Sequence, residues 1–295
     1  MIINIQENIS NRDNINPDVI YNRCDLWADN YASVSIKCEK MEYNMMLSLD
    51  GDSCYLGAWL MNIPTNVMLE SERAIFERFP QVKRIKYEYG LTPTGYASPK
   101  NHFRITLPDT DDELRARLSK KGRYNIKREK DILSKTFGGY DVVEYMAEGC
   151  PSEILDTYFK MKEATHNVDY HMTASEYIKF YHVSHVYVLK VGAEVGAILL
   201  SCEQCSVVYI ENLTYDLRYA KYSCGQVLYD IYLTILIQKG YKELFLAGGN
   251  LDYKKRYGSV EEPIYNCIVF RNRFDHALYA IRECLRKVKN RIIQR

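Results

Sequence analysis

The chain has 295 residues, of which 47% are hydrophobic and 26% charged, as is typical of a globular protein with one large core or two medium ones. Its net charge is only +1, from 39 basic and 38 acidic residues, so the chain as a whole has no electrostatic attraction for nucleic acid. No run of about 18 apolar residues could span a membrane, and the N-terminus lacks the basic and apolar regions of a signal peptide.

These features predict a cytoplasmic protein with no membrane span and no DNA partner. Nine scattered cysteines fit a reducing compartment. Cys202-x-x-Cys205 has no second cysteine or histidine pair that would complete a metal site, so we expect no metal.

The first 109 residues predict a small α/β domain, which is a candidate for the acceptor side of an enzyme. After about 40 polar residues, "YNMMLSL" and "YLGAWLM" flank "DGDS" and predict a hairpin. Residues 65–79 have the apolar spacing of a helix, and "RIKYEYG" and "HFRITL" are typical of strands.

Residues 110–295 predict a second domain. Thr110 begins a capping box, "TDDE", and a strongly basic helix over residues 114–130 follows it. "YDVVEYM" is typical of a strand, Pro151 begins another helix, and "TASE" from Thr173 is a second capping box.

The rest of this domain has a regular pattern. Three strands in a meander, "VYVLKV", "VGAILLS" and "VVYIENL", precede an apolar helix over residues 225–238. The strands "ELFLAG" and "IYNCIVF" and a final helix follow. Strands and helices mixed in this order predict an α+β (mixed α/β) fold.

One loop stands out because it enters a helix directly from a strand. "RYAKYSCGQVLYDIY", residues 218–232, joins cations and small residues to the apolar helix. A helix start offers unpaired N–H groups and a positive dipole end, which suit a phosphate. Taken alone, the loop fits an ordinary helix entry better, because it matches neither a Walker loop nor GxGxxG.

The neighbouring segments change this interpretation. The order of strand, basic loop, Gly225 helix, strand and "GGNLDYKKRYGS" resembles the GNAT acyltransferase superfamily. "LSKKGRYNIKREKDIL" and "LDYKKRYGS" resemble motifs of its CelD/BcsL-type branch, which is related to the Fem-type aminoacyl transferases. The resemblance covers about residues 110–272.

The resemblance implies a GNAT-like core with a central, mostly antiparallel mixed sheet flanked by helices, preceded by a smaller, degenerate GNAT-like half. It also implies that the loop holds the pyrophosphate of an acyl-CoA, most simply acetyl-CoA, while the pantetheine arm pairs with the strand before it. The implied donor-binding residues are Ile210, Asn212, Arg218, Lys221, Ser223, Cys224, Gly225, Gln226 and Asn250. Asn250, beside two glycines, fits a turn cap better. The loop keeps only the last glycine of the usual GNAT pattern.

Acyl transfer to an amine needs a proton acceptor for the amine and a proton donor for the leaving thiolate. GNAT enzymes commonly use a tyrosine as the donor, and here Tyr253 is the first candidate and Tyr257 the second. Glu211, the only acid on the central strand, is the candidate base. For each of the three, a packed aromatic ring or a salt-bridged carboxylate is the simpler interpretation.

Other polar residues have weaker claims to a role. His166 and His171 lie where acceptor contacts are expected, although surface histidines are common. Cys224 at a helix start could have a depressed pKa and form an acyl-cysteine. The basic helix 114–130 is either a solvated face or a surface for an anionic acceptor, tRNA or the CoA phosphates.

The sequence therefore predicts a GNAT-type N-acyltransferase that uses acyl-CoA and acts on an amino group of a small molecule, with an amino sugar of an envelope polysaccharide as one candidate. One alternative is a Fem-like ligase that uses aminoacyl-tRNA, the only case in which tRNA is a partner. Another is a non-catalytic GNAT-like binding module.

Overall fold

The computed structural model describes residues 2–7, 31–38, 41–56, 63–166, 173–181, 183–204, 207–246 and 252–293. The chain forms two compact units, Met1–Lys100 with Pro263–Arg295, and Asn101–Glu262. The division differs from the predicted boundary at residue 109, because the last strand and helix of the chain belong to the first unit. Within the described residues, no helix combines the length and apolar character needed to span a bilayer.

The first unit begins with a four-stranded antiparallel meander, which contains the predicted hairpin. The predicted helix follows the meander. Its elements are β1 (Ile2–Glu7), β2 (Tyr31–Cys38), β3 (Met41–Asp50), β4 (Ser53–Leu56), α1 (Thr65–Arg78), β5 (Arg84–Gly90), β12 (Val260–Phe270) and α8 (Arg273–Ile293). β5 is parallel to β4 and antiparallel to β12. The core of this unit lies between the sheet and α1 and includes Met45, Leu56, Val67, Ile75 and Ile85.

The second unit has a sheet in the order β6-β11-β10-β9-β8-β7. Its elements are β6 (Tyr96–Thr106), α2 (Asp111–Ala116), α3 (Lys120–Phe137), β7 (Tyr140–Met146), η3 (Ala147–Gly149), α4 (Ser152–His166), α5 (Ala174–Phe180), β8 (His185–Val191), β9 (Glu194–Gln204), β10 (Val207–Tyr215), η4 (Leu217–Tyr222), α6 (Cys224–Gln238), β11 (Glu243–Phe245) and α7 (Asp252–Lys255). Only the β10–β11 pair is parallel. The predicted mixed, mostly antiparallel sheet is confirmed.

The two units repeat one topology. In each, a four-stranded meander leads through a crossover helix to a fifth strand that is parallel to the fourth, and a sixth strand pairs antiparallel with the fifth. The crossover helix is α1 in the first unit and α6 in the second. The sixth strand of each unit comes from elsewhere in the chain, because β6 pairs with β11 while β12 pairs with β5.

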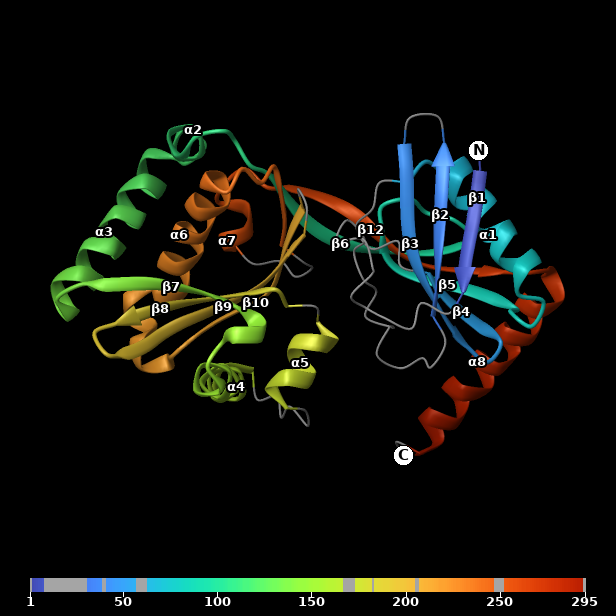
Figure 1. Ribbon diagram of the computed structural model, residues 1–295. Helices are drawn as coiled ribbons and strands as arrows, with labels where there is room; N and C mark the ends of the chain where they lie inside the picture. The colour runs from blue at the N-terminus through green and yellow to red at the C-terminus, as the bar shows by residue number, and fades with distance from the viewer. Residues whose placement is uncertain are drawn as a thin grey trace. The chain divides into compact units, whose positions relative to one another are not determined.

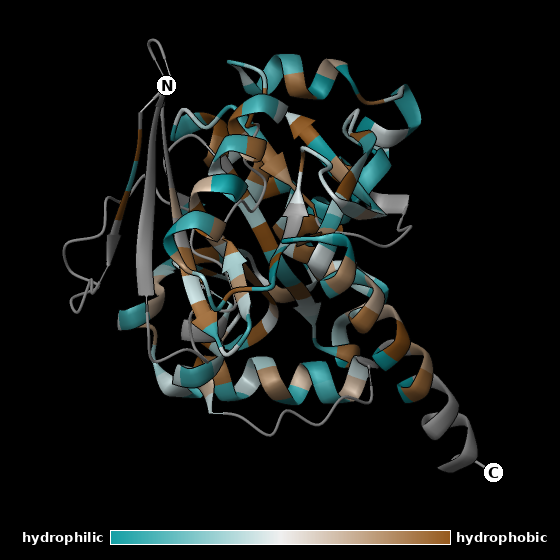
Figure 2. Ribbon diagram, turned by 90° about the vertical axis from the view of Figure 1, so that its right-hand side faces the viewer, coloured by the Kyte–Doolittle hydropathy of each residue, from teal (hydrophilic) through white to brown (hydrophobic). Residues whose placement is uncertain are grey.

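Helices cover both faces of the second unit's sheet (Figure 1). α3 and α6 lie on one face, where Leu133, Leu189, Leu199 and Leu228 share a core. α4 and α5 lie on the other, where Tyr158, Val188 and Ile198 share another. The helices carry hydrophilic and hydrophobic bands, as amphipathic helices on a sheet do (Figure 2).

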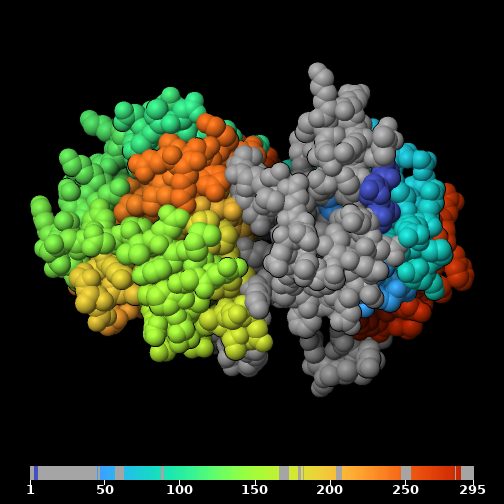
Figure 3. All heavy atoms as spheres, in the orientation of Figure 1, coloured from blue at the N-terminus to red at the C-terminus, as the bar shows by residue number. Residues whose placement is uncertain are grey.

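The single basic helix predicted over residues 114–130 is in fact two helices. α2 ends after Ala116, and α3 begins at Lys120, with Ser119 as its N-cap. The Ser119 hydroxyl accepts a hydrogen bond from the backbone N–H of Gly122 at 3.0 Å, which satisfies a donor of the new helix. α3 lies on the outer surface of the second unit (Figure 3, green).

Candidate active site

β10 and β11 stay paired over only three residues. The register joins Val207 with Glu243 and ends with Tyr209 opposite Phe245. β10 continues to Tyr215, whereas after β11 the N–H of Leu246 donates to the carbonyl of Phe103 on β6 at 2.9 Å. No described strand pairs with this side of β10 beyond Tyr209, and this parting of the strands is the geometry expected from the sequence.

Glu211 is the extra residue of a β-bulge at this point. Ile210 is opposite Ser201 of β9 and Asn212 is opposite the next residue, Leu200, so the register shifts by one residue at Glu211. Ile210 is buried in the core, whereas Glu211 and Asn212 are half-buried. The bulge changes the direction of side chains just where β10 leaves β11.

α6 begins without a side-chain cap. Its N-cap, Ser223, has a left-handed backbone with φ of 56°, and it is the only non-glycine residue with positive φ in the described part of the chain. The Ser223 carbonyl accepts from the N–H groups of Gln226 and Val227 at 2.9 and 3.0 Å, but its side chain makes no capping hydrogen bond. The helix start therefore presents its positive dipole end to a ligand.

A cavity of about 500 Å³ opens at this helix start. Residues of α4, β10, η4 and α6 line it: Thr165, Leu213, Thr214, Tyr215, Ala220, Ser223, Cys224, Gly225, Gln226 and Tyr229. The Thr214 hydroxyl is buried and has no hydrogen-bond partner among the described residues. A buried, unpaired hydroxyl that lines a cavity is available to a bound molecule.

Four of the nine predicted donor-binding residues, Ser223 to Gln226, line this cavity. The two predicted cations, Arg218 and Lys221, do not line it. Arg218 is exposed, and its guanidinium forms 2.7 Å ion pairs with Asp216 and Glu194. Lys221 is exposed, with its ammonium 4.9 Å from the ring centroid of Tyr222. Neither of these two cations therefore contributes to the lining at the helix start.

Cys224 does not have the depressed pKa expected at a helix start. Its side chain is fully buried, and burial raises the pKa of the thiol to about 11. At neutral pH the thiol is protonated, which disfavours the acyl-cysteine route.

Tyr257 is buried and belongs to an ionic cluster around Asp230 of α6. Its hydroxyl donates a hydrogen bond to the Asp230 carboxylate, which also receives one from Arg115 of α2. Lys130 of α3 forms an ion pair with Asp230 at 2.6 Å. Burial alone would raise the pKa of Asp230, but the hydrogen bonds and the charge of Lys130 lower it below its usual value. This arrangement favours the packed-aromatic interpretation of Tyr257.

The Asp230 cluster also changes the interpretation of the basic segment. Arg115 and Lys130 neutralise a buried carboxylate, and the Arg117 guanidinium donates to the carbonyl of Thr106 at 2.6 Å. Arg115, Arg117 and Lys130 therefore interact with other residues of the second unit. Fewer cations of the basic segment are available to an anionic partner than the sequence indicates.

Several predicted residues cannot be placed. Asn250 and His171 lie outside the described residues, and the side chains of Tyr253 on α7 and His166 at the end of α4 are not described. Lys254, next to Tyr253, is buried, and burial lowers the pKa of its ammonium to about 8. The roles of these residues stay predictions.

Sequence reasoning missed Lys162, which lies on the buried stripe of α4. It is 6% exposed, and its neighbours Leu155, Tyr158 and Met161 are buried as well. Burial lowers the pKa of its ammonium, while the charge of Glu211 acts in the opposite direction. A lysine one position after Met161, in an apolar stripe of period three and four, was the available signal.

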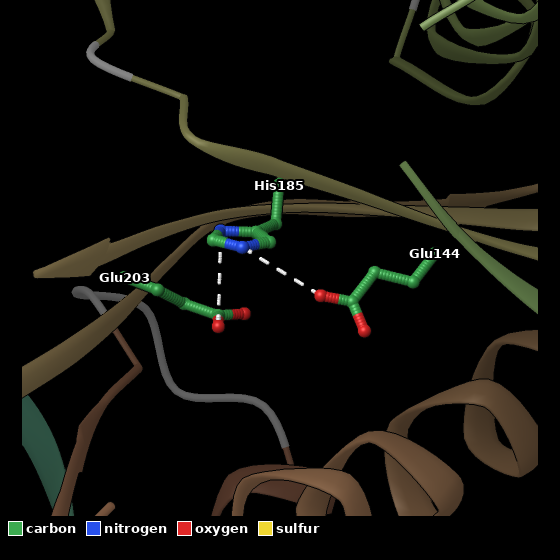
Figure 4. Close-up of side chains that lie close together, drawn as sticks. All are labelled: Glu144, His185 and Glu203. Carbon is green, nitrogen blue, oxygen red and sulfur yellow. Dashed lines mark ion pairs between the residues drawn. The ribbon is translucent and has the colours of Figure 1, made fainter. Parts of the chain in front are cut away.

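A second polar cluster lies near the other end of α6. Glu144, His185 and Glu203 of β7, β8 and β9 bring ligand-type atoms within 4.8 Å of one another (Figure 4). The ammonium of Lys239 at the C-cap of α6 forms ion pairs with both carboxylates, at 3.0 Å for Glu203. α6 has 15 residues, which corresponds to about 22 Å of helix, so this cluster is distant from the cavity.

The ammonium of Lys239 compensates the negative charge of these carboxylates. Tyr187 donates to Glu203 at 2.6 Å, Ser201 donates to the same oxygen at 3.0 Å, and a cation at a helix C-terminus is favourable. The cluster is explained as a network that joins three strands to α6.

Comparisons with known proteins agree with this geometry. Residues 120–255 match the model of the acetyltransferase (GNAT) domain family. No curated protein matches the sequence. Among solved structures, FemX has a similar fold, with a TM-score of 0.64 and 10% identity over 88% of this chain and 92% of FemX.

The C-terminal domain (DUF2156) of an Agrobacterium fabrum protein assigned as a lysylphosphatidylglycerol synthetase is also similar. Its TM-score is 0.55, with 14% identity over 84% of this chain and 86% of that one. At these identities the similarity concerns the fold alone, and it extends over more residues than the second unit contains. The segment that matches the acetyltransferase (GNAT) domain model, residues 120–255, lies within the second unit.

Proposed function

We propose that this protein is an N-acyltransferase that takes an acyl group from acyl-CoA, with acetyl-CoA as the simplest donor, and transfers it to an amino group of a small molecule. The uncapped start of α6 at the 500 Å³ cavity carries this proposal. A diphosphate fits there because backbone N–H groups and the helix dipole favour an anion.

The residues of the cavity suit the rest of such a donor. The side of β10 that no longer pairs with β11 offers backbone groups to the amides of a pantetheine arm, and the buried Thr214 hydroxyl lacks a partner in the described structure. A Cβ atom at Gly225 would contact the Tyr215 ring at 3.4 Å, so a side chain at this position would narrow the cavity.

In the proposed reaction the acceptor nitrogen attacks the thioester carbonyl, a C–N bond forms and the C–S bond breaks. Glu211 at the bulge accepts a proton from the amine, directly or through water, and Tyr253 gives one to the leaving thiolate. No external oxidant or metal is needed for this balance. The bulge supports the role of Glu211 because it turns this side chain out of the regular ladder where the strands part.

The test is donor binding measured by thermal unfolding. Millimolar acetyl-CoA should raise the melting temperature, because a ligand that binds only the folded state stabilises it. Gln226→Glu adds a negative charge to the lining at constant size and should weaken binding by about tenfold. Gln238→Glu, exposed at the far end of α6, is the matched control and should bind like the native protein.

Absence of any shift with CoA compounds would contradict the proposal. Stabilisation by aminoacyl-tRNA alone would instead favour the Fem-like alternative, and no turnover despite CoA binding would favour a binding module. Membership of the CelD/BcsL-type branch and a cytoplasmic location stay predictions, supported by the motifs and composition of the sequence.

A further inference from the structure

Lys162 has an unusual environment for a lysine. It follows Met161 on the stripe of α4 that packs against the sheet, and only 6% of it is exposed. Lysine is almost never buried to this extent without a partner, because removing an ammonium from water is costly. The position therefore needs a compensating negative charge.

No ion pair or hydrogen bond joins the Lys162 ammonium to another residue in the described part of the chain. The charge that acts on it is that of Glu211, at the β10 bulge. Glu211 has interactions of its own, and it is half-buried. The Lys162 ammonium is thus exposed to the charge of Glu211, which also takes part in further interactions.

Residues close to Lys162 and to Glu211 in the chain line the donor cavity. Thr165, one turn after Lys162 on α4, lines the cavity, and so do Leu213 and Thr214, which follow Glu211 on β10. A donor bound in the cavity would present its acyl group toward the parting of the strands. The neighbouring charges would then face the acceptor.

We propose that Lys162 binds a carboxylate of the acceptor, and that the acceptor is an α-amino acid or a molecule that ends in one, with its amino group at Glu211. The inference rests on the proposed acyl transfer and specifies its acceptor. An α-amino acid carries a positive amino group and a carboxylate on the same carbon atom. The amino group complements the charge of Glu211, and the carboxylate complements the charge of Lys162. The ammonium of Lys162 forms a stronger hydrogen bond with a carboxylate than with a neutral carbonyl such as that of the thioester.

The experiment compares amines with and without the carboxylate. The twenty L-amino acids, their amides, glucosamine and putrescine are incubated with acetyl-CoA, and release of the CoA thiol is measured. We expect at least one amino acid to react, with kcat/KM about 10- to 100-fold above that of its amide, because the amide leaves the buried ammonium unpaired.

Two variants separate binding from folding. Lys162→Met should lower kcat/KM for the amino acid at least tenfold more than it lowers kcat/KM for the amide, so that the preference for the carboxylate disappears. Its melting temperature should equal or exceed that of the native protein, because the change removes a buried charge. Lys160→Met, at an exposed position of the same helix, is the matched control and should keep the preference.

The outcomes distinguish this inference from the proposed function. If acetyl-CoA binds but glucosamine or putrescine reacts as well as any amino acid, the inference is overturned and the acyl transfer stands. A requirement for a donor with a carboxylate in its acyl chain, such as succinyl-CoA, would also overturn it. Equal losses for acid and amide with a lower melting temperature would assign Lys162 a structural role.

Discussion

The hydroxyl of Tyr257 donates a hydrogen bond to the carboxylate of Asp230, and this bond joins the segment after α7 to the buried face of α6. Asp230 has no exposed surface and also receives the charges of Arg115 and Lys130. One carboxylate therefore holds together α2, α3, α6 and the segment after α7.

Replacing this carboxylate should destabilise the second unit. Asp230→Asn leaves two buried or half-buried cations without their counter-charge, and we expect a loss of about 3 kcal/mol in the free energy of unfolding. Tyr257→Phe removes one hydrogen bond and should cost about 1 kcal/mol. Urea unfolding measures both, and an Asp230→Asn protein as stable as the native one would contradict this role.

Catalysis should distinguish two tyrosines that the sequence treats alike. We expect Tyr253→Phe to lower kcat by about 100-fold if it protonates the thiolate, whereas folded Tyr257→Phe should retain most of its turnover, because its hydroxyl is committed to Asp230. Single-turnover assays with acetyl-CoA provide the measurement. Equal losses in the two variants would assign Tyr257 a part in the chemistry.

Glu211→Gln should also lower kcat, by about 100-fold, because the amide cannot accept the proton of the amine. Glu163→Gln, at an exposed carboxylate of α4, is the matched control and should keep the native kcat. The donor-induced shift in melting temperature should be the same in both variants. Full turnover by Glu211→Gln would mean that another group, or water alone, accepts the proton.

The Cys224 thiol should be unreactive at neutral pH. Burial raises its pKa to about 11, so the thiolate fraction at pH 7.5 is well below 1%. Iodoacetamide should modify the exposed Cys284 much faster than Cys224, as mass spectrometry of the peptides would show. Rapid modification of Cys224, prevented by acetyl-CoA, would restore the covalent route.

The stability of the first unit should depend on the pH through Glu72 of α1. Burial raises the pKa of Glu72 to about 7 from its ordinary value of 4.5, although a hydrogen bond from Thr94 opposes this change. Between these two pH values the unfolded chain loses the proton and the folded state keeps it. Stability should therefore fall as the pH rises through this window, by up to about 3 kcal/mol.

Thermal unfolding of the native protein and of two variants between pH 4.5 and 8 tests the titration of Glu72. Glu72→Gln should remove most of the dependence, because the amide does not titrate. Glu77→Gln, at an exposed position of the same helix, should keep it. Parallel curves for the native protein and Glu72→Gln would exclude Glu72 as the titrating group.

Local features were predictable because neighbouring residues determine them. Both predicted N-caps form, with the Thr110 hydroxyl accepting from Glu113 N–H at 3.3 Å and the Thr173 hydroxyl from Glu176 N–H at 3.2 Å, and at Thr173 the Glu176 side chain accepts the reciprocal bond of the capping box. The strand–loop–helix order around Gly225 likewise predicted where the cavity opens, because a small-residue helix start depends on adjacent residues.

Pairings between distant residues were decided only by the tertiary structure. The sequence does not show that β12 completes the first unit or that β6 completes the second, because strand partners are chosen by the whole sheet. Nor does it show that Arg115 and Lys130 face Asp230, or that Lys162 is buried beside Glu211. From the sequence alone, a charged residue is expected to be solvated. Whether the fold buries it depends on contacts with residues that are distant in the chain.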